Sequence, residues 1–122
     1  MKHRDVYRTE LTPVSFLERN AYVFPDKTAV IHGSRHYTYR QFEERVNRLA
    51  SALRKAGMKK HDRVAFICPN IPAMLEAHYG VPLAGGILVA INIRLSSDEI
   101  GYILEHSGSK FLFVDGEFEP VV

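Results

Sequence analysis

Three short apolar runs constrain the fold of this chain more than any other part of its sequence. They occupy residues 64–68 (VAFIC), 87–91 (ILVAI) and 111–114 (FLFV), and no polar residue interrupts any of them. A strand that is apolar on both faces needs cover on both faces, which is typical of a parallel sheet between helices. We therefore expect an α/β fold with a mostly parallel βαβαβ sheet covered by helices, and with right-handed crossovers.

The two segments between these runs predict the crossover helices. The first should span residues 71–83, with Asn70 as its N-cap and a kink or an early end at Pro82. The second should span residues 97–106, because the letters SSDE at its start offer a capping box and Gly108 follows its last turn.

A β-hairpin and two helices should precede the sheet. Residues 28–39 predict the hairpin, because β-branched and aromatic residues flank a turn at Gly33. Residues 38–57 then predict an amphipathic helix whose first letters, TYRQ, hold a capping box. An earlier helix should begin at Pro13 and end before Pro25. Its inward side chains should be those of Phe16, Leu17 and Ala21.

Composition and charge place the chain among ordinary globular proteins. Its 122 residues are 46% hydrophobic and 25% charged, and a net charge of +2 is too balanced to indicate a nucleic acid partner. The single cysteine, Cys68, fits a reducing, cytoplasmic compartment, and no apolar stretch is long enough to predict a membrane span. Residues 1–12 lack any pattern and predict a flexible arm, which leaves residues 13–122 as one domain or part of one.

The glycine pair Gly85-Gly86 raises the question of a phosphate site. Glycines that bind phosphate follow a strand and open a helix, where free N–H groups and the positive end of the helix dipole meet the anion. This pair follows a predicted helix and opens a strand, so it lies at the negative end of the dipole. We expect it to turn the chain and to bind no phosphate.

Ligands of open α/β sheets gather at the carboxyl ends of the strands, which makes the loops after each apolar run the places to search. Only the loop NIRLSS offers suitable groups, Asn92 and Arg94, and ordinary loop polarity with a helix cap is the favoured alternative. His78 and Tyr79 lie on a crossover helix that is apolar on more than one side, for which a core or subdomain contact is favoured over an acyl pocket. These four residues are the candidates for a substrate or interface edge.

Metal and nucleophile chemistry find little support in the sequence. The six histidines share no ligand spacing, and His32 and His36 at best face each other across the hairpin. Cys68 ends a buried strand and precedes a proline, so an inert core thiol is favoured over a nucleophile. We therefore expect no catalytic, cofactor-binding or metal-binding residue in the chain.

Two motifs and their order resemble a known family. Residues 38–42 (TYRQF) are similar to its first core motif, a Thr-Tyr pair before a helix, and residues 83–92 (LAGGILVAIN) are similar to its second, a turn into a strand that ends in Asn or Asp. Across residues 13–115 the chain resembles the N-terminal part of the AMP-forming acyl-CoA synthetases. These belong to the adenylate-forming enzymes, which include peptide-synthetase adenylation domains and firefly luciferase.

The resemblance implies a ligase that works in two steps. A carboxylic acid, for which a fatty acid is expected, reacts with ATP to give an acyl-adenylate and pyrophosphate, and the thiol of coenzyme A then displaces AMP. ATP, Mg²⁺ and coenzyme A would serve the full-length parent. The family's phosphate-binding loop, its Mg²⁺-binding acid and its mobile C-terminal lysine have no counterpart in these residues.

We therefore expect residues 13–122 to be a partial AMP-binding subdomain, truncated at its C-terminal end, which neither binds these cofactors nor adenylates an acid alone. Open sheet edges would make it marginally stable or self-associating. Two alternatives remain open: a small stand-alone α/β binding or interaction module without catalysis, and a structural piece that pairs subunits, for example in a homodimer.

Overall fold

The computed structural model describes residues 10–122, so most of the predicted flexible arm lies outside the described residues. The chain begins with helix α1 (Pro13–Val23), the hairpin of β1 (Thr28–His32) and β2 (Arg35–Thr38), and helix α2 (Tyr39–Lys55). Strand β3 (Arg63–Ile67), helix α3 (Pro72–Leu83), strand β4 (Ile87–Ala90), helix α4 (Ser97–Ser107) and strand β5 (Phe111–Val114) follow. A short 3₁₀ helix, η2 (Gly116–Val121), comes last.

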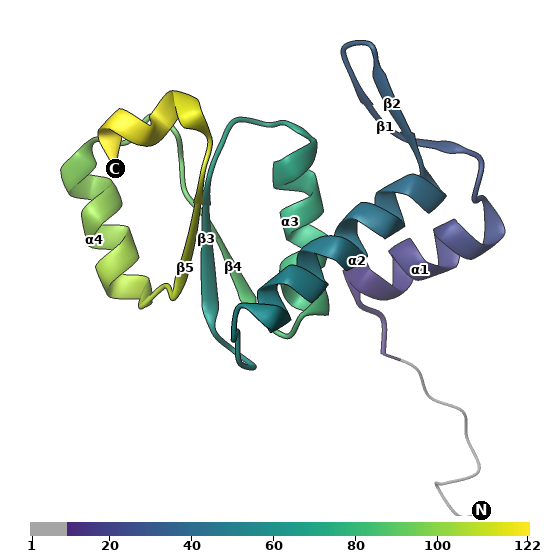
Figure 1. The fold of residues 1–122 in the computed structure, drawn as a ribbon, viewed down its shortest axis with the longest axis horizontal. Coiled ribbons are helices and arrows are strands. Elements are labelled where there is room, and N and C mark those ends of the chain that lie inside the picture. Colours follow the sequence, from purple (N-terminus) through teal and green to yellow (C-terminus); the bar gives the residue numbers. More distant parts are fainter. Residues whose placement is uncertain (1–9) are drawn as a thin grey trace, which may run out of the picture.

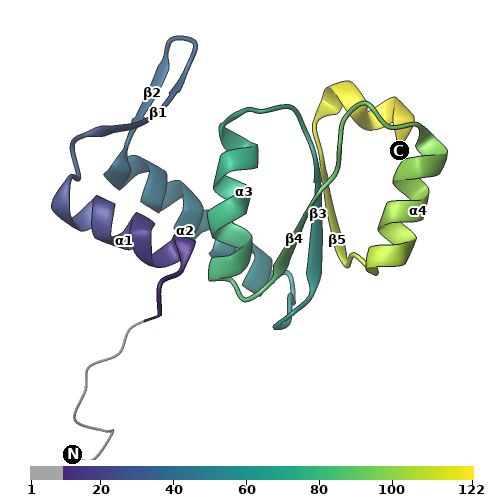
Figure 2. The ribbon, with the colours of Figure 1, turned by 180° about the vertical axis from the view of Figure 1, so that it is seen from behind.

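The three apolar runs form a parallel sheet in the order β4-β3-β5, with β3 in the centre. Figures 1 and 2 show α3 and the C-terminal end of α2 on one face of this sheet and α4 on the other, while α1 and the hairpin lie beyond α3. The predicted α/β fold, with a hairpin followed by a helix-covered βαβαβ unit, is confirmed. Its two crossovers place α3 and α4 on opposite faces because β4 and β5 lie on opposite sides of β3.

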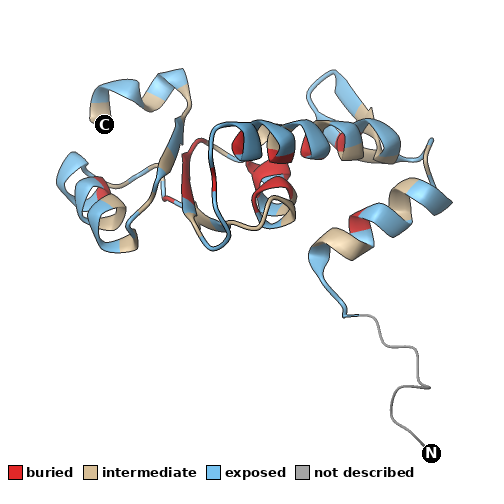
Figure 3. Cartoon of the chain, turned by 60° about the horizontal axis from the view of Figure 1, so that its bottom comes forward, coloured by how far each residue is buried: buried red, intermediate tan, exposed pale blue. Residues whose placement is uncertain are grey.

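Strand β3 divides its side chains between two clusters of core residues. Val64 and Phe66 face α2 and α3, whereas Ala65 and Ile67 face α4. A third cluster joins Leu17 of α1 and Val30 of the hairpin to α2. Figure 3 shows the buried residues gathered in β3, in α3 and on one side of α2.

The outer strands are less buried than their sequence predicts. Ile87 of β4 is 44% exposed, and Leu112 and Phe113 of β5 are each 38% exposed. A three-stranded sheet has two edges, so only its central strand can be covered from every direction. The expected marginal stability or self-association stays a prediction.

Capping boxes are present at three helix starts, and those of α2 and α4 were predicted. Thr38 and Gln41 exchange hydrogen bonds at the start of α2, as do Ser96 and Glu99 at the start of α4, and Thr12 pairs with Ser15 at the start of α1. Each exchange satisfies N–H groups that have no partner within the helix.

Three local expectations were wrong. The N-cap of α3 is Ile71 and not Asn70, because Pro72 occupies the first helical position. The helix reaches its predicted end at Leu83, so it does not unwind early at Pro82, and a kink there stays a prediction. Phe16 is 52% exposed, because α1 buries only a narrow stripe that includes Leu17.

The glycine pair turns the chain as predicted. The N–H of Gly85 donates to the carbonyl of Pro82, and the N–H of Gly86 donates to the carbonyl of Val81, both at 2.9 Å. Gly85 has a φ of +96°, which favours glycine. These bonds satisfy carbonyls at the end of α3 and leave no row of N–H groups for a phosphate.

Candidate functional site

A cavity of about 580 Å³ lies between the hairpin and α3. Its size falls within the range of small-molecule sites, about 300–1,000 Å³. The lining contains both sequence-predicted residues of α3, His78 and Tyr79. The remaining lining residues are Pro13, Val30, Ile31, His32, Asn70, Ile71, Pro72, Met74 and Leu75.

Helix α3 fixes the two predicted side chains in different ways. The Nδ1 of His78 lies 2.7 Å from the carbonyl oxygen of Met74, which can only accept, so the Nδ1–H donates this hydrogen bond and the Nε2 of that tautomer is an acceptor. The ring of Tyr79 packs edge-on against Phe42 of α2, with the ring centroids 5.6 Å apart. His78 is exposed, whereas Tyr79 is half-buried. His78 therefore gives this wall of the cavity a polar side chain, and Tyr79 gives it a ring that is held by packing.

An ion pair braces this wall against the hairpin. Arg45 of α2 donates from Nε to the carboxylate of Glu76 on α3, and its guanidinium lies 4.7 Å from the ring centroid of Tyr37 on β2. The hydrogen bond to Glu76 raises the pKa of Arg45, so the guanidinium stays charged. Since the side chain of Glu76 is only 10% exposed, this pair satisfies a nearly buried carboxylate.

Asn92 and Arg94 do not line the cavity. They lie in the loop between β4 and α4, where the Asn92 side-chain oxygen accepts a hydrogen bond from the Arg94 N–H at 2.9 Å. That bond is a turn-forming contact, which gives the polarity of Asn92 a local structural use. The structure therefore brings together two of the four predicted residues, and a role for Asn92 and Arg94 at a substrate edge stays a prediction.

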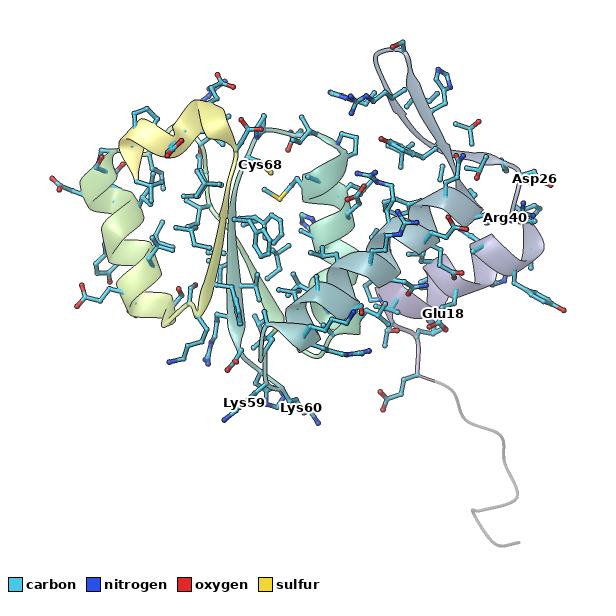
Figure 4. All side chains as sticks on the ribbon, viewed as in Figure 1. Glu18, Asp26, Arg40, Lys59, Lys60 and Cys68 are labelled. Atoms are coloured by element: carbon cyan, nitrogen blue, oxygen red, sulfur yellow. The ribbon has the colours of Figure 1, made fainter. Side chains whose placement is uncertain are left out.

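Cys68 lies at the carboxyl end of β3, at the opposite end of the sheet from Lys59 and Lys60 (Figure 4). Its thiol is buried. Burial raises its pKa, and the nearby charge of Asp115 raises it further. A thiol that resists ionisation is a poor nucleophile, in keeping with the predicted inert role.

No candidate metal centre is present within residues 10–122, where no group of three or more His, Cys, Asp or Glu side chains gathers. The hairpin register also separates two histidines that could at best have faced each other. His32 pairs with Arg35, and His36 pairs with Ile31.

Within residues 10–122, no helix has the length and apolar character needed to cross a membrane.

Sequence reasoning missed the hairpin side of the cavity, formed by Val30, Ile31 and His32. The one signal in the sequence was Ile31, an apolar residue close to the hairpin turn. In the structure Ile31 is 67% exposed. Its partners on α3 lie about forty positions further along the chain, and nothing in a single sequence pairs them.

Comparisons with known proteins point to one family. Residues 17–121 match the family described as AMP-binding enzyme. The chain is 51% identical over 110 residues to the peroxisomal acetate/butyrate–CoA ligase of Arabidopsis thaliana, a match that covers 90% of this chain and 19% of that protein. It is 50% identical over 105 residues to the 4-hydroxybutyrate–CoA ligase 2 of Metallosphaera sedula, covering 86% of this chain and 19% of that protein.

A solved structure agrees with these relatives. The fatty acyl CoA synthetase of Mycobacterium tuberculosis superposes with a TM-score of 0.85 at 34% identity, over 88% of this chain and 22% of that one. The chain spans about a fifth of the length of the curated relatives it matches.

Proposed function

We propose, from the premise that this chain belongs to the family of AMP-binding enzymes, that it is the N-terminal part of an acid–CoA ligase. The family match spans residues 17–121, nearly the whole of the described chain, and this is the observation that carries the proposal. The resemblance of the sequence to acyl-CoA synthetases is confirmed, because the two curated relatives that are 51% and 50% identical to this chain are CoA ligases.

The proposed reaction has two steps and uses ATP, Mg²⁺ and coenzyme A. The carboxylate attacks the α-phosphate of ATP and releases pyrophosphate, after which the CoA thiolate attacks the acyl carbon and releases AMP. Residues 10–122 supply a folded scaffold to this reaction: a parallel sheet whose carboxyl ends face one side, where α/β enzymes bind ligands. We propose that the remaining chain of a longer parent supplies the phosphate-binding groups, and that residues 1–122 alone are inactive.

Short-chain carboxylic acids are the substrates that we propose for the parent. The two curated relatives described above are ligases of acetate or butyrate and of 4-hydroxybutyrate, at 51% and 50% identity. The fatty acyl CoA synthetase is less similar, at 34% identity. The expected fatty acid is therefore our second choice of substrate.

Location and assembly remain predictions. The cytoplasm is the predicted compartment, while the Arabidopsis relative is described as peroxisomal. A homodimer is likewise a prediction.

The experiment that tests this function is a substrate panel on the protein encoded by the complete reading frame that contains residues 1–122. The purified protein is incubated with ATP, Mg²⁺ and coenzyme A, and acyl-CoA is detected by mass spectrometry. We expect butyryl-CoA or acetyl-CoA to form faster than octanoyl-CoA. Formation of no acyl-CoA from any acid in the panel would contradict the proposal.

The cavity favours a second candidate function, a stand-alone binding module. Such a module would need a ligand site complete within residues 10–122, and the space between the hairpin and α3 is large enough to be one. A reading frame that ends at Val122 would favour the module over the ligase.

A further inference from the structure

Six cationic side chains gather at the amino end of the parallel sheet. They come from the end of α2, the loop that follows it, the first residue of β3 and the residue before β5. Backbone hydrogen bonding joins the two strand starts, since the Lys110 N–H donates to the carbonyl of Arg63 at 2.9 Å. Figure 4 shows Lys59 and Lys60 pointing away from the sheet. All six are exposed, and together they are named the basic end: Arg54, Lys55, Lys59, Lys60, Arg63 and Lys110.

Few negative charges oppose the basic end. The two acids near it are Asp62 in the loop and Glu105 in the last turn of α4. The Asp62 carboxylate is already engaged, because it accepts a hydrogen bond from the backbone N–H of Lys59 at 2.9 Å. Both ion pairs found within residues 10–122 lie elsewhere, so no cation of the basic end is part of an ion pair in this stretch.

Helix ends account for only part of this positive charge. Helices α2, α3 and α4 all end at this side of the sheet (Figure 1), and each helix end carries about half a negative charge. Arg54 serves one of them, because its guanidinium donates to the carbonyl of Leu83 at 2.7 Å. Even with both acids added, three such ends hold less negative charge than the six cations hold positive charge.

The loop between α2 and β3 holds its two lysines in one arrangement. His61 has a φ of +71°, in the left-handed region that is uncommon for a residue with a Cβ. Its N–H donates to the carbonyl of Gly85 at 2.8 Å, and the Ile87 N–H donates to the carbonyl of Asp62 at 2.9 Å. Uncommon backbone conformations that the surrounding structure maintains are concentrated at functional sites. The lysines therefore project from a turn that is fixed before any partner arrives, which lowers the cost of binding.

The composition of the basic end fits an anionic lipid surface better than other polyanions. Residues 54–63 contain no Phe, Tyr or Trp on which the bases of a nucleic acid could stack. Four of the six cations are lysines, which are depleted at protein–protein interfaces. Ile87, which is 44% exposed, pairs with Arg63 at the same edge. Clustered lysines beside an exposed apolar side chain are typical of a surface that binds anionic lipids.

The carboxyl end of the sheet carries the opposite charge. Arg94 lies in the loop before α4, but acids outnumber it there. A negatively charged surface therefore attracts one end of the sheet and repels the other, which sets the orientation of the molecule on it. The acids begin α4 or follow β5, and they are Asp98, Glu99, Asp115, Glu117 and Glu119.

We propose that the basic end binds the surface of a membrane that contains anionic phospholipids. Its six cations meet the charged lipid headgroups, and Ile87 contacts the apolar boundary beneath them. The carboxyl ends of the strands, where α/β enzymes bind ligands, face away from the lipid. This binding involves no covalent step, and it does not depend on the proposed ligase activity.

The first test is co-sedimentation of vesicles with the protein encoded by the complete reading frame that contains residues 1–122. One set of vesicles is phosphatidylcholine alone, and the other contains phosphatidylserine as about a third of its lipid. We expect at least about tenfold tighter binding to the anionic vesicles, and loss of this preference in about 0.5 M salt. Equal binding to both kinds of vesicle, no binding, or a preference that persists in high salt would overturn the proposal.

The second test uses paired variants of exposed cations. Lys59→Gln with Lys60→Gln should weaken binding to the anionic vesicles by about tenfold or more, since each lysine near such a surface contributes about fivefold. Lys27→Gln with Arg35→Gln is the control, because it removes the same charge from exposed positions near and on the hairpin and should leave the affinity unchanged. Lys59→Arg with Lys60→Arg keeps the charge and should bind like the unaltered protein.

Equal weakening by the two glutamine pairs, an unchanged affinity in the first pair, or loss of binding in the arginine pair would overturn the assignment of the basic end. A single-stranded RNA oligonucleotide is the competing probe. If it bound more tightly than the anionic vesicles and the first glutamine pair abolished that binding, the partner would be a nucleic acid and not a membrane. These assays contain no ATP, coenzyme A or acid substrate, so the proposed ligase function fails only in the acyl-CoA assay.

Discussion

At the scale of single residues, the glycine pair shows how closely the turn after α3 packs. A Cβ atom added to Gly86 would lie 2.9 Å from the sulfur of Met58 and 3.1 Å from the carbonyl oxygen of Asp62. Met58 is buried in the cluster beneath α2, so it has little space to move away. The second glycine is therefore required by packing, whereas Gly85 is required by its positive φ.

We predict that Gly86→Ala lowers the free energy of unfolding by about 1–3 kcal/mol, the usual cost of overpacking. Gly101→Ala is the control, because a Cβ there meets nothing within 4 Å and lies inside α4. That control should be neutral or should stabilise the chain by up to about 1 kcal/mol. Urea unfolding followed by circular dichroism measures the free energy of unfolding of both variants. Equal changes in the two variants would contradict the prediction, because they would show that the added Cβ at position 86 costs no stability.

A single charge on α2 gives a prediction about pH. Burial raises the pKa of Glu43, and the charges of Glu18 on α1 and Glu44 add to the effect. Figure 4 shows Glu18 on α1, the helix that packs beside α2. Because the folded state raises this pKa above its unfolded value, ionised Glu43 costs stability above the folded pKa, and this cost disappears as the pH falls below the unfolded pKa.

Glu43→Gln should therefore stabilise the chain at pH 7 by about 0.2–0.5 kcal/mol, a small value because the site is screened by solvent. The gain should vanish near pH 4 and shrink in high salt. Unfolding at pH 7 and pH 4 measures it, with Glu105→Gln on the exposed side of α4 as the control. A gain of equal size at both pH values would contradict the electrostatic explanation.

At the scale of elements, the pair Arg45–Glu76 joins α2 to α3 and, through Tyr37, to the hairpin. Removing Arg45 leaves the carboxylate of Glu76 without its partner, although the side chain of Glu76 is only 10% exposed. Buried charges without partners are costly, although replacing both members of a pair by apolar residues is often tolerated.

We predict that Arg45→Met lowers the free energy of unfolding by about 1.5–3 kcal/mol, as expected for a hydrogen bond to a charged group. Adding Glu76→Met should restore part of that loss, so the double-mutant cycle should give a coupling energy above about 1 kcal/mol. Arg40→Met is the control, because its ion pair with Asp26 is exposed (Figure 4) and worth at most about 1 kcal/mol. Additive effects of the Arg45 and Glu76 substitutions would show that the pair is not a brace.

Elements that depend on local signals were predictable from the sequence. The capping boxes act across three residues and the hairpin turn across two, so the signals at Thr38, Ser96 and Gly33 are all contained in short windows. A local signal would also have corrected the wrong N-cap prediction at Asn70. Proline favours the first helical position, so Pro72 makes Ile71 the N-cap.

The candidate site was less predictable, because it depends on contacts between distant elements. His78 and Tyr79 could be named from their helix, but the hairpin wall and the Arg45–Glu76 bond, 31 residues apart in sequence, follow from packing. The burial of β4 and β5 was overestimated for a similar reason. An apolar run indicates a strand, but its place in the sheet decides how much of it is exposed.

At the scale of the whole molecule, residues 10–122 form a complete βαβαβ unit with a hairpin and two helices packed beside it (Figure 1). The match to the AMP-binding family covers residues 17–121 of this unit, and the chain spans about a fifth of the length of the curated CoA ligases that it matches. We propose that the unit is the scaffold of an adenylating enzyme whose phosphate chemistry lies in the remaining length.

Butyrate-dependent exchange of labelled pyrophosphate into ATP tests this proposal most directly, since it reports the adenylation step alone. It should be measured with Mg²⁺ on residues 1–122 and on the protein of the complete reading frame, at equal molar concentration. We predict exchange in the longer protein and none above the acid-free blank in the 122-residue chain. Acid-dependent exchange by residues 1–122 alone would contradict the proposal, as would its absence from the longer protein with every acid tested.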